Sequence, residues 1–314
     1  MKGKFTKSSC LFTGVLAAML LAPLTTHATS ISLGAAGDFN TFIFGNYYSD
    51  NSDVEGRLAV GGNAHMNNYS VGLKLDPRTA GDVLVVGHDL YFNRGAINHG
   101  NARVGGNAYM SNYTVGGQVY AGATLPLDFS AEEVYLKSLS ASLSQETPNG
   151  ASQFIYNGYR LTGDGTSNLQ IFNLDGSNLF AASSLVIANI PDDATVLINI
   201  SEDFSGLTDM GFGALADCPD NVLFNFYQAT TVNLSGVGVA GSILAPLANI
   251  NAYNGNINGT LIAQSWNGPV QQNYYPFNPY TAGEAAPVPE PATMLLLGSG
   301  LAGLAGVRLR KKEK

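Results

Sequence analysis

Short apolar segments alternate with turns rich in Gly and Asn along most of this chain. DVLVV at 82–86 and ATVLINI at 194–200 are typical of the apolar segments. Valine followed by glycine closes three of them, at Val60, Val86 and Val104, which are 26 and 18 residues apart. Gly and Asn reach the positive φ that sharp corners need. Short strands at such intervals predict successive coils of a β-solenoid.

One stretch of the chain occurs twice. LAVGGNAHMNNYSVG at 58–72 is followed by ARVGGNAYMSNYTVG at 102–116, an offset of 44 residues at which most positions are identical. We interpret the copies as two rungs of a stack, in the same or neighbouring coils and with matching backbone. Stacking places like residues above one another, so recurring Asn can form side-chain ladders.

The spacing of apolar residues changes to that of a helix in LPLDFSAEEVYLKSLSASLSQE. This segment predicts one helix packed against the strands. Ser130 and Glu133 have the spacing of a capping box, with Phe129 and Val134 at the hydrophobic-staple positions. They predict a helix over 131–145. Its apolar stripe consists of Leu136, Leu139 and Leu143. The fold class expected is therefore mostly β, a β-solenoid with one packed α-helix over 29–283; a β-sandwich is the alternative.

Charge narrows the range of partners. Residues 29–287 hold 7 Lys and Arg against 21 Asp and Glu, a net charge of −14. No Lys or Arg occurs between Arg160 and Arg308. Binding to a phosphate backbone requires cations, so we expect no nucleic acid as a partner.

Both ends of the chain carry targeting patterns. Residues 1–28 combine three lysines, a short apolar centre and a small residue at Ala28, which predicts a signal peptide cleaved there. A Pro- and Ala-rich linker at 284–291 precedes an uncharged apolar run at 292–307, interpreted as a membrane-contacting helix, and a basic tail at 308–314 expected to stay cytoplasmic. Cys218 is the one cysteine left after cleavage, so we expect no disulfide.

The C-terminal pattern resembles the PEP-CTERM sorting signal of Gram-negative bacteria. Its motif residues are Pro289, Glu290 and Pro291. The resemblance implies an exported protein that passes through an inner-membrane intermediate. An exosortase would then process it for the cell surface or extracellular matrix.

The body resembles a second family, the choice-of-anchor A domain of bacterial surface adhesins. The resemblance runs from AAGDFNTFIFGNYYSDNSDVEGRLAVGGNA through the helix to GVAGSILAPLANINAYNGNINGTLIA, and covers nearly all of 33–277. It implies a β-helix with a packed helix, similar to ice-binding-type adhesins, and relatives that include a collagen-binding surface protein. Residues 271–277, QQNYYPF, depart from it by carrying tyrosines where the family has a Glu- and His-containing stretch.

Residues with catalytic or metal-binding chemistry are few, and none forms a known motif. His65, His88 and His99 lack metal-ligand spacing, and Tyr109 replaces His65 in the second repeat copy. Cys218 lies between carboxylates, which oppose thiolate formation. Acidic clusters leave Ca²⁺ open as an alternative, although neither follows a known calcium loop. They are Asp50 with Asp53 and Glu55, and Asp192 with Asp193. We therefore predict no cofactor and no enzyme, with a secreted carbohydrate-active enzyme as the weaker alternative.

The sequence feature that favours a binding function is a set of aromatic residues among Asn and Gln. They are Tyr47, Tyr48, Tyr69, Tyr91, Tyr113, Tyr253, Tyr274, Tyr275 and Trp266. Rings with polar tips beside adaptable amides suit recognition by many weak contacts; the other interpretation is that these rings pack between rungs. The function expected is a surface or matrix adhesin, or a biofilm component, that binds an extracellular polysaccharide or a matrix protein. A calcium-dependent matrix protein is the alternative.

Overall fold

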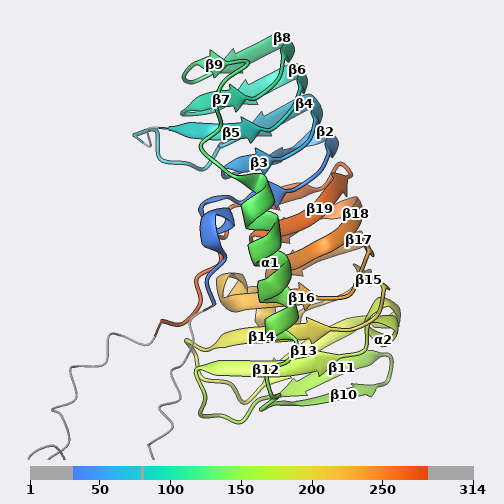
Figure 1. The fold of residues 1–314 in the computed structure, drawn as a ribbon. Coiled ribbons are helices and arrows are strands. Elements are labelled where there is room, and N and C mark those ends of the chain that lie inside the picture. The colour runs from blue at the N-terminus through green and yellow to red at the C-terminus, as the bar shows by residue number, and fades with distance from the viewer. Residues whose placement is uncertain (1–30, 79–80, 282–314) are drawn as a thin grey trace, which may run out of the picture.

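The computed structural model describes residues 31–78 and 81–281, which are mostly β with two α-helices. Almost all strands belong to three parallel ladders, and each turn of the chain, here called a coil, contributes a strand to successive ladders (Figure 1). The mostly β prediction is confirmed. The β-sandwich alternative is wrong, because the ladders are parallel throughout and β10–β11 is the only antiparallel pairing within the described ranges.

The first ladder is the one that helix α1 covers, and we call it the covered face. Its strands, in spatial order, are β12 (Leu169–Leu174), β14 (Thr195–Ile200), β16 (Val222–Phe226), the start of β18 (Ser242–Asn258), the start of β19 (Leu261–Asn267), β1 (Thr41–Ile43), β3 (Leu58–Val60), β5 (Asp82–Val86), β7 (Asn101–Val104) and β9 (Val119–Tyr120). Where α1 covers it, the strands are apolar at most positions because both sides of the ladder are buried. The end strands β7 and β9 carry the partly exposed Arg103 and the exposed Tyr120.

The second ladder is open to solvent on its outer side. It is built from β15 (Phe204–Thr208), the first half of β17 (Thr231–Ala240), the middle of β18, the end of β19, and the first halves of β2 (Tyr47–Val54), β4 (Ala64–Val71), β6 (Leu90–Ile97) and β8 (Ala108–Val115). The second halves of these long strands turn a corner and form the third ladder together with β20 (Gln271–Asn273).

The chain does not run through this stack in order. It enters at the middle with β1 and β2, builds coils up to β8 and β9, and returns along the side as α1 (Phe129–Leu143). It then restarts at the opposite end and works back, so that β19 and β20 meet the first coil from below (Figure 1). Thr41 of β1 thus pairs with Leu58 on one side and with Leu261 on the other.

The far end of the stack, beyond β12, carries additional elements. A small sheet of β10 (Ala151–Ile155), β11 (Gly158–Thr162) and β13 (Ser184–Ala188) lies there, with α2 (Gly176–Ala181) packed on β15. Asn149 covers the outer edge of β12: its Nδ2 donates to Leu169 O (2.8 Å) and its Oδ1 accepts from Ile171 N (2.7 Å). Three 3₁₀ helices complete the described elements, η1 (Gly34–Asp38), η2 (Gly213–Asp217) and η3 (Pro219–Asn221).

Two hydrophobic cores hold the molecule together. One fills the inside of the coils, where Val60, Val86 and Val104 stack in register. The other lies between α1 and the outer side of the covered face, and includes the predicted helix residues Leu136 and Leu143. The prediction of one helix packed along the strands is therefore confirmed. The second helix, α2, was not predicted.

Three details of the sequence interpretation are wrong. The repeat copies are not in neighbouring coils, because β5 and β6 form a complete coil between them; their strands β4 and β8 both pair with β6. Helix α1 spans 129–143 instead of 131–145, and its N-cap is Asp128, not Ser130. Val134 is 72% exposed and makes no staple.

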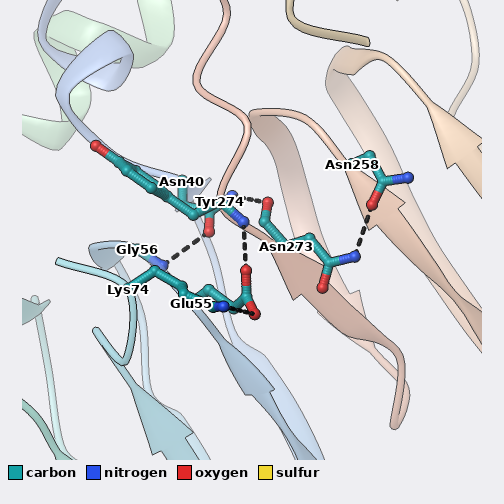
Figure 2. Close-up of polar contacts among 7 residues, drawn as sticks. All are labelled: Asn40, Glu55, Gly56, Lys74, Asn258, Asn273 and Tyr274. Atoms are coloured by element: carbon teal, nitrogen blue, oxygen red, sulfur yellow. Dashed lines mark hydrogen bonds and ion pairs between the residues drawn. The ribbon is translucent and has the colours of Figure 1, made fainter. Parts of the chain in front are cut away.

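The last coil joins the first through a hydrogen-bonded seam (Figure 2). The buried Asn40 amide donates to Gly259 O (3.0 Å) and Asn273 O (3.1 Å), and its Oδ1 accepts from Gly56 N (2.9 Å). Glu55 accepts from Tyr274 N (2.9 Å). Residues 271–277, where the sequence departs from the choice-of-anchor A pattern, therefore have a structural role in this chain.

Candidate functional site: the exposed aromatic face

Four aromatic side chains from successive coils stack on the outer side of the second ladder. Tyr48, His65, Tyr91 and Tyr109 form this aromatic column, with ring centroids 4.7, 4.3 and 5.0 Å apart and rings within 17° of parallel. Strand alternation puts them outside, since the preceding residues Tyr47 and Ala64 point into the core. In-register parallel pairing then puts one ring directly above the next.

A second column of polar side chains runs beside the rings, two residues further along each strand. This amide column consists of Asp50, Asn67, Asn93 and Ser111. Asn93 Nδ2 donates to Asn67 Oδ1 (2.8 Å), and Ser111 Oγ donates to Asn93 Oδ1 (2.8 Å). The Asn ladder predicted from the repeat is thus present. The two columns line a shallow hollow of about 480 Å³.

The stacking decides which parts of the rings a ligand can meet. Inside the column each ring face is covered by its neighbour, so a ligand meets mainly ring edges and hydroxyls. The outer ring face of Tyr109 ends the column on one side, and Asn267 stands in register with Tyr48 at the other. Partial desolvation in the stack raises the pKa of Tyr91, and Asp89 and Tyr109 add to the shift. The Tyr91 hydroxyl therefore remains a neutral donor and acceptor at ordinary pH.

The same ladder continues toward the far end with a polar surface. Asn233, Asn251 and Asn267 stand in the register of Tyr48, and with Tyr253 they line a second hollow of about 520 Å³. Together the two hollows extend along one face. We call this whole surface the aromatic face.

The structure divides the aromatic residues that the sequence singled out. Tyr47, Tyr69 and Trp266 are core residues packed inside the coils, whereas Tyr48 and Tyr91 belong to the column. Burial raises the pKa of Tyr47 to about 12, and its hydroxyl bonds to Tyr69 (O···O 2.6 Å) and accepts from Gln272 Nε2 (3.0 Å). The remaining four, Tyr113, Tyr253, Tyr274 and Tyr275, are exposed outside the column.

Sequence reasoning missed two members of the column. The sequence pattern marks His65 only as a histidine without metal-ligand spacing, and Tyr109 only as its replacement in the second copy. A signal was available in the repeat, because His65 and Tyr109 occupy the same position of the two copies and Tyr91 follows Val86-Gly87 at the same distance.

The candidate catalytic and metal-binding residues do not converge. His88 and His99 lie outside the column, and Cys218 is exposed between η2 and η3. Asp192 and Asp193 are exposed in the turn before β14. Across 31–78 and 81–281, no three His, Cys, Asp or Glu side chains gather where they could hold a metal.

The first acidic cluster is divided by a corner of the coil. Asp50 pairs with Asn67 on the second ladder, whereas Asp53 pairs with Ser70 on the third. Burial, with a smaller contribution from the charge of Glu55, raises the pKa of Asp53. Because Asp50 and Asp53 stand on different ladders, the cluster does not present its carboxyl groups as one set of ligands.

Charged residues of both signs meet in a hollow of about 510 Å³ beside the seam. It is lined by Gly37, Asp38, Arg57, Lys74, Leu75, Asp76 and Tyr274. Lys74 Nζ lies 4.0 Å from a Glu55 oxygen, and Glu55 fixes the Tyr274 backbone (Figure 2). The Glu55–Tyr274 bond joins the first and last coils, so we assign this hollow to the seam and not to ligand binding.

Comparison with known proteins assigns the body of the chain. Residues 32–274 match the family described as "Putative Ice-binding-like adhesive domain". The chain belongs to this family. No curated protein matches. Two solved ice-binding proteins are similar in structure. One, from the Antarctic ascomycete Antarctomyces psychrotrophicus, has a TM-score of 0.30 and 13% identity over 80% of this chain and 100% of that one. The other, from an Antarctic biological consortium, has a TM-score of 0.24 and 11% identity over 81% and 94%.

The C-terminal segment matches a sorting motif. Residues 287–311 match the PEP-CTERM protein-sorting motif, which implies export, processing by an exosortase and a cell-surface or extracellular location. Ala28, the motif residues Pro289 to Pro291 and the apolar run 292–307 lie outside the described residues, so their roles remain predictions. Within the described residues, no helix has both the length and the apolar character needed to cross a membrane.

Proposed function

We propose that this protein is a non-enzymatic adhesin of the cell surface or extracellular matrix. Its stack of coils, a β-solenoid of the choice-of-anchor A type, presents the aromatic face to a repetitive polymer such as an extracellular polysaccharide or a fibrous matrix protein. The observation that carries the proposal is the aromatic column with its hydrogen-bonded amide column on one open face. Membership of an adhesive-domain family and the sorting motif support it.

The physical argument rests on spacing and rigidity. Neighbouring rungs of a β-stack lie about 4.8 Å apart, so the face repeats the same edge, hydroxyl and amide groups at a fixed interval. A polymer with a repeating unit can make the same weak contact at many rungs. Because the rings hold one another in place, binding orders few side chains and loses little entropy.

Attachment of the exported protein to arrayed polysaccharides and matrix proteins tests the proposal. Tyr91→Ala removes the ring between His65 and Tyr109, and each aromatic contact is worth about 0.5–1.5 kcal/mol. We expect about tenfold weaker binding to whichever polymer the unmodified protein retains. Asn93→Ala, which breaks the amide column, is expected to weaken binding to the same polymer.

Tyr156→Ala is the matched control, because Tyr156 is fully exposed on the β10–β11 turn and lies outside the aromatic face. It should leave binding unchanged. Thermal unfolding of each variant shows whether the fold is intact. Binding to none of the polymers, or equal binding by Tyr91→Ala and Tyr156→Ala, would exclude the aromatic face as the adhesive surface.

A further inference from the structure

The two ends of the stack differ in how they are closed. At the far end, Asn149 and Gly150 pair with the edge of β12, α2 packs on β15, and the small sheet ends in the antiparallel edge strand β10. At the other end, β8 pairs with β6 on one side, and no strand within 31–78 or 81–281 pairs with its outer edge. The interior apolar residues Met110 and Val115 are only partly buried there.

The end coil has the sequence of an interior coil. Ten of the fifteen residues at 102–116 are identical to those at 58–72, where β4 pairs with β2 on one side and β6 on the other. Equivalent side chains therefore differ in burial: Tyr69 is 2% exposed, and Tyr113 is 41% exposed. Strand β7 of this coil pairs with β5 and β9, but strand β8 has a sequence suited to pairing on two sides and is paired on one.

The end coil also lacks the features that keep an open strand edge from pairing. Residues 104–127 contain no Asp, Glu, Lys, Arg or His and no Pro within a strand, although 29–287 carries a net charge of −14. Exposed edges are ordinarily protected by charges, prolines or bulges. Two copies of this acidic protein would repel one another over most of their surfaces, and this neutral end is where they approach at the lowest electrostatic cost.

We propose that the protein forms a two-fold dimer in which the β8 ends of two copies meet end to end. The partner is a second copy of this chain, because the strand that fits the open edge of β8 is one from a coil with the same sequence pattern. A two-fold axis places β8 antiparallel to β8 of the partner subunit and covers Met110 and Tyr113 of both copies. Tyr109 is 53% exposed, and its outer ring face ends the column. This residue lies at the rim of the contact.

The different structure of the far end limits the size of this assembly. A head-to-tail contact would need a far end that continues the coils, but there Asn149 covers β12, α2 packs on β15, and the edge strand β10 runs antiparallel to β11. An isologous contact uses the same patch twice and stops at the dimer. The dimer would carry two aromatic faces on one elongated body, which strengthens binding to a polymer through avidity.

Sedimentation velocity of the full exported chain, over a range of concentrations, tests the dimer. Tyr113→Lys places a charge at the open end of the coil interior, and Thr114→Lys places one on the outer side of the same strand. Each should convert the dimer to a monomer, with at least tenfold weaker self-association. Tyr253→Lys, an exposed Tyr-to-Lys change on the second ladder away from β8, is the matched control and should remain dimeric.

Each other outcome would overturn the proposal. An unmodified chain that stays monomeric at every concentration would mean that the end is covered by a segment of the same chain or is tolerated open. Association that both β8 variants retain would place the contact elsewhere. Open-ended polymers in place of dimers would exclude the two-fold arrangement. Thermal unfolding of Thr114→Lys, the milder variant, separates lost association from lost folding.

Discussion

At the scale of single residues, the corner between the second and third ladders explains why Asn recurs at one position of successive coils. Asn51, Asn68, Arg94 and Asn112 occupy this corner in four successive coils, with φ of 53°, 51°, 53° and 52°. Asparagine tolerates the left-handed conformation because its short side chain can bond locally. Here Asn68 Nδ2 donates to Asn51 Oδ1 (3.0 Å). Asparagine at the corner thus also forms a rung-to-rung bond.

Arg94 is the exception at this corner, and replacing it should stabilise the protein. An arginine held at φ 53° carries backbone strain that asparagine largely avoids. We expect Arg94→Asn to raise the free energy of unfolding by about 1 kcal/mol. Asn68→Ala, at the equivalent corner of another coil, should lower it. Denaturant titration of both variants checks the pair, and a loss of stability in Arg94→Asn would show that the arginine side chain makes a contact that outweighs the strain.

At the scale of elements, helix α1 shows how a tertiary contact moves a boundary. The helix begins at Phe129, whose ring packs against Phe42 at 5.2 Å, and Asp128 Oδ1 accepts from Ala131 N (3.0 Å). At the other end, Asn225 Nδ2 donates to Ser140 O (2.9 Å) and Asn199 Nδ2 donates to Leu143 O (2.9 Å). Buried amides of the covered face thus satisfy carbonyls in the last turn of the helix.

The two candidate N-caps of α1 can be distinguished by mutation. Removing a capping side chain typically costs about 1 kcal/mol. Asp128→Ala should therefore lower the free energy of unfolding by about that amount, and Ser130→Ala should leave it within about 0.5 kcal/mol. Thermal or denaturant unfolding measures both. The reverse order of effects would restore the capping box that the sequence suggests.

At the scale of the whole molecule, the seam joins residues more than 200 positions apart. Strands near 40–60 close against strands near 260–273, so neither half of the stack is complete without the other. Asn40 joins three segments here, by its bonds to Gly56, Gly259 and Asn273 (Figure 2). We therefore expect the described body to unfold as one cooperative unit.

Asn40→Ala tests the importance of the seam. The change leaves the Gly56 N–H and two carbonyls without their side-chain partner in a buried place, and each unmet group costs about 1–3 kcal/mol. With three such groups, we expect a loss of at least about 3 kcal/mol in the free energy of unfolding, with a single transition. Asn251→Ala, whose exposed amide makes only a long 3.4 Å bond, is the matched control and should change stability little. Equal effects from the two changes would mean that the seam is not a critical joint.

Local pattern by itself determined the mostly β class, the turns with positive φ, the stacked Val60, Val86 and Val104, and one helix with its buried stripe, because these follow from side-chain size and backbone preference within a few residues. Only the tertiary structure decided the order of the coils, since Thr41 meets Leu261 by closure of the whole stack and not by any local rule. It also separated Tyr47 from its neighbour Tyr48. Alternation puts the two rings on opposite sides of the strand, but which side is inside depends on the coils that surround it. The aromatic column exists because parallel register aligns residues from coils of unequal length, and that alignment is a property of the assembled ladder.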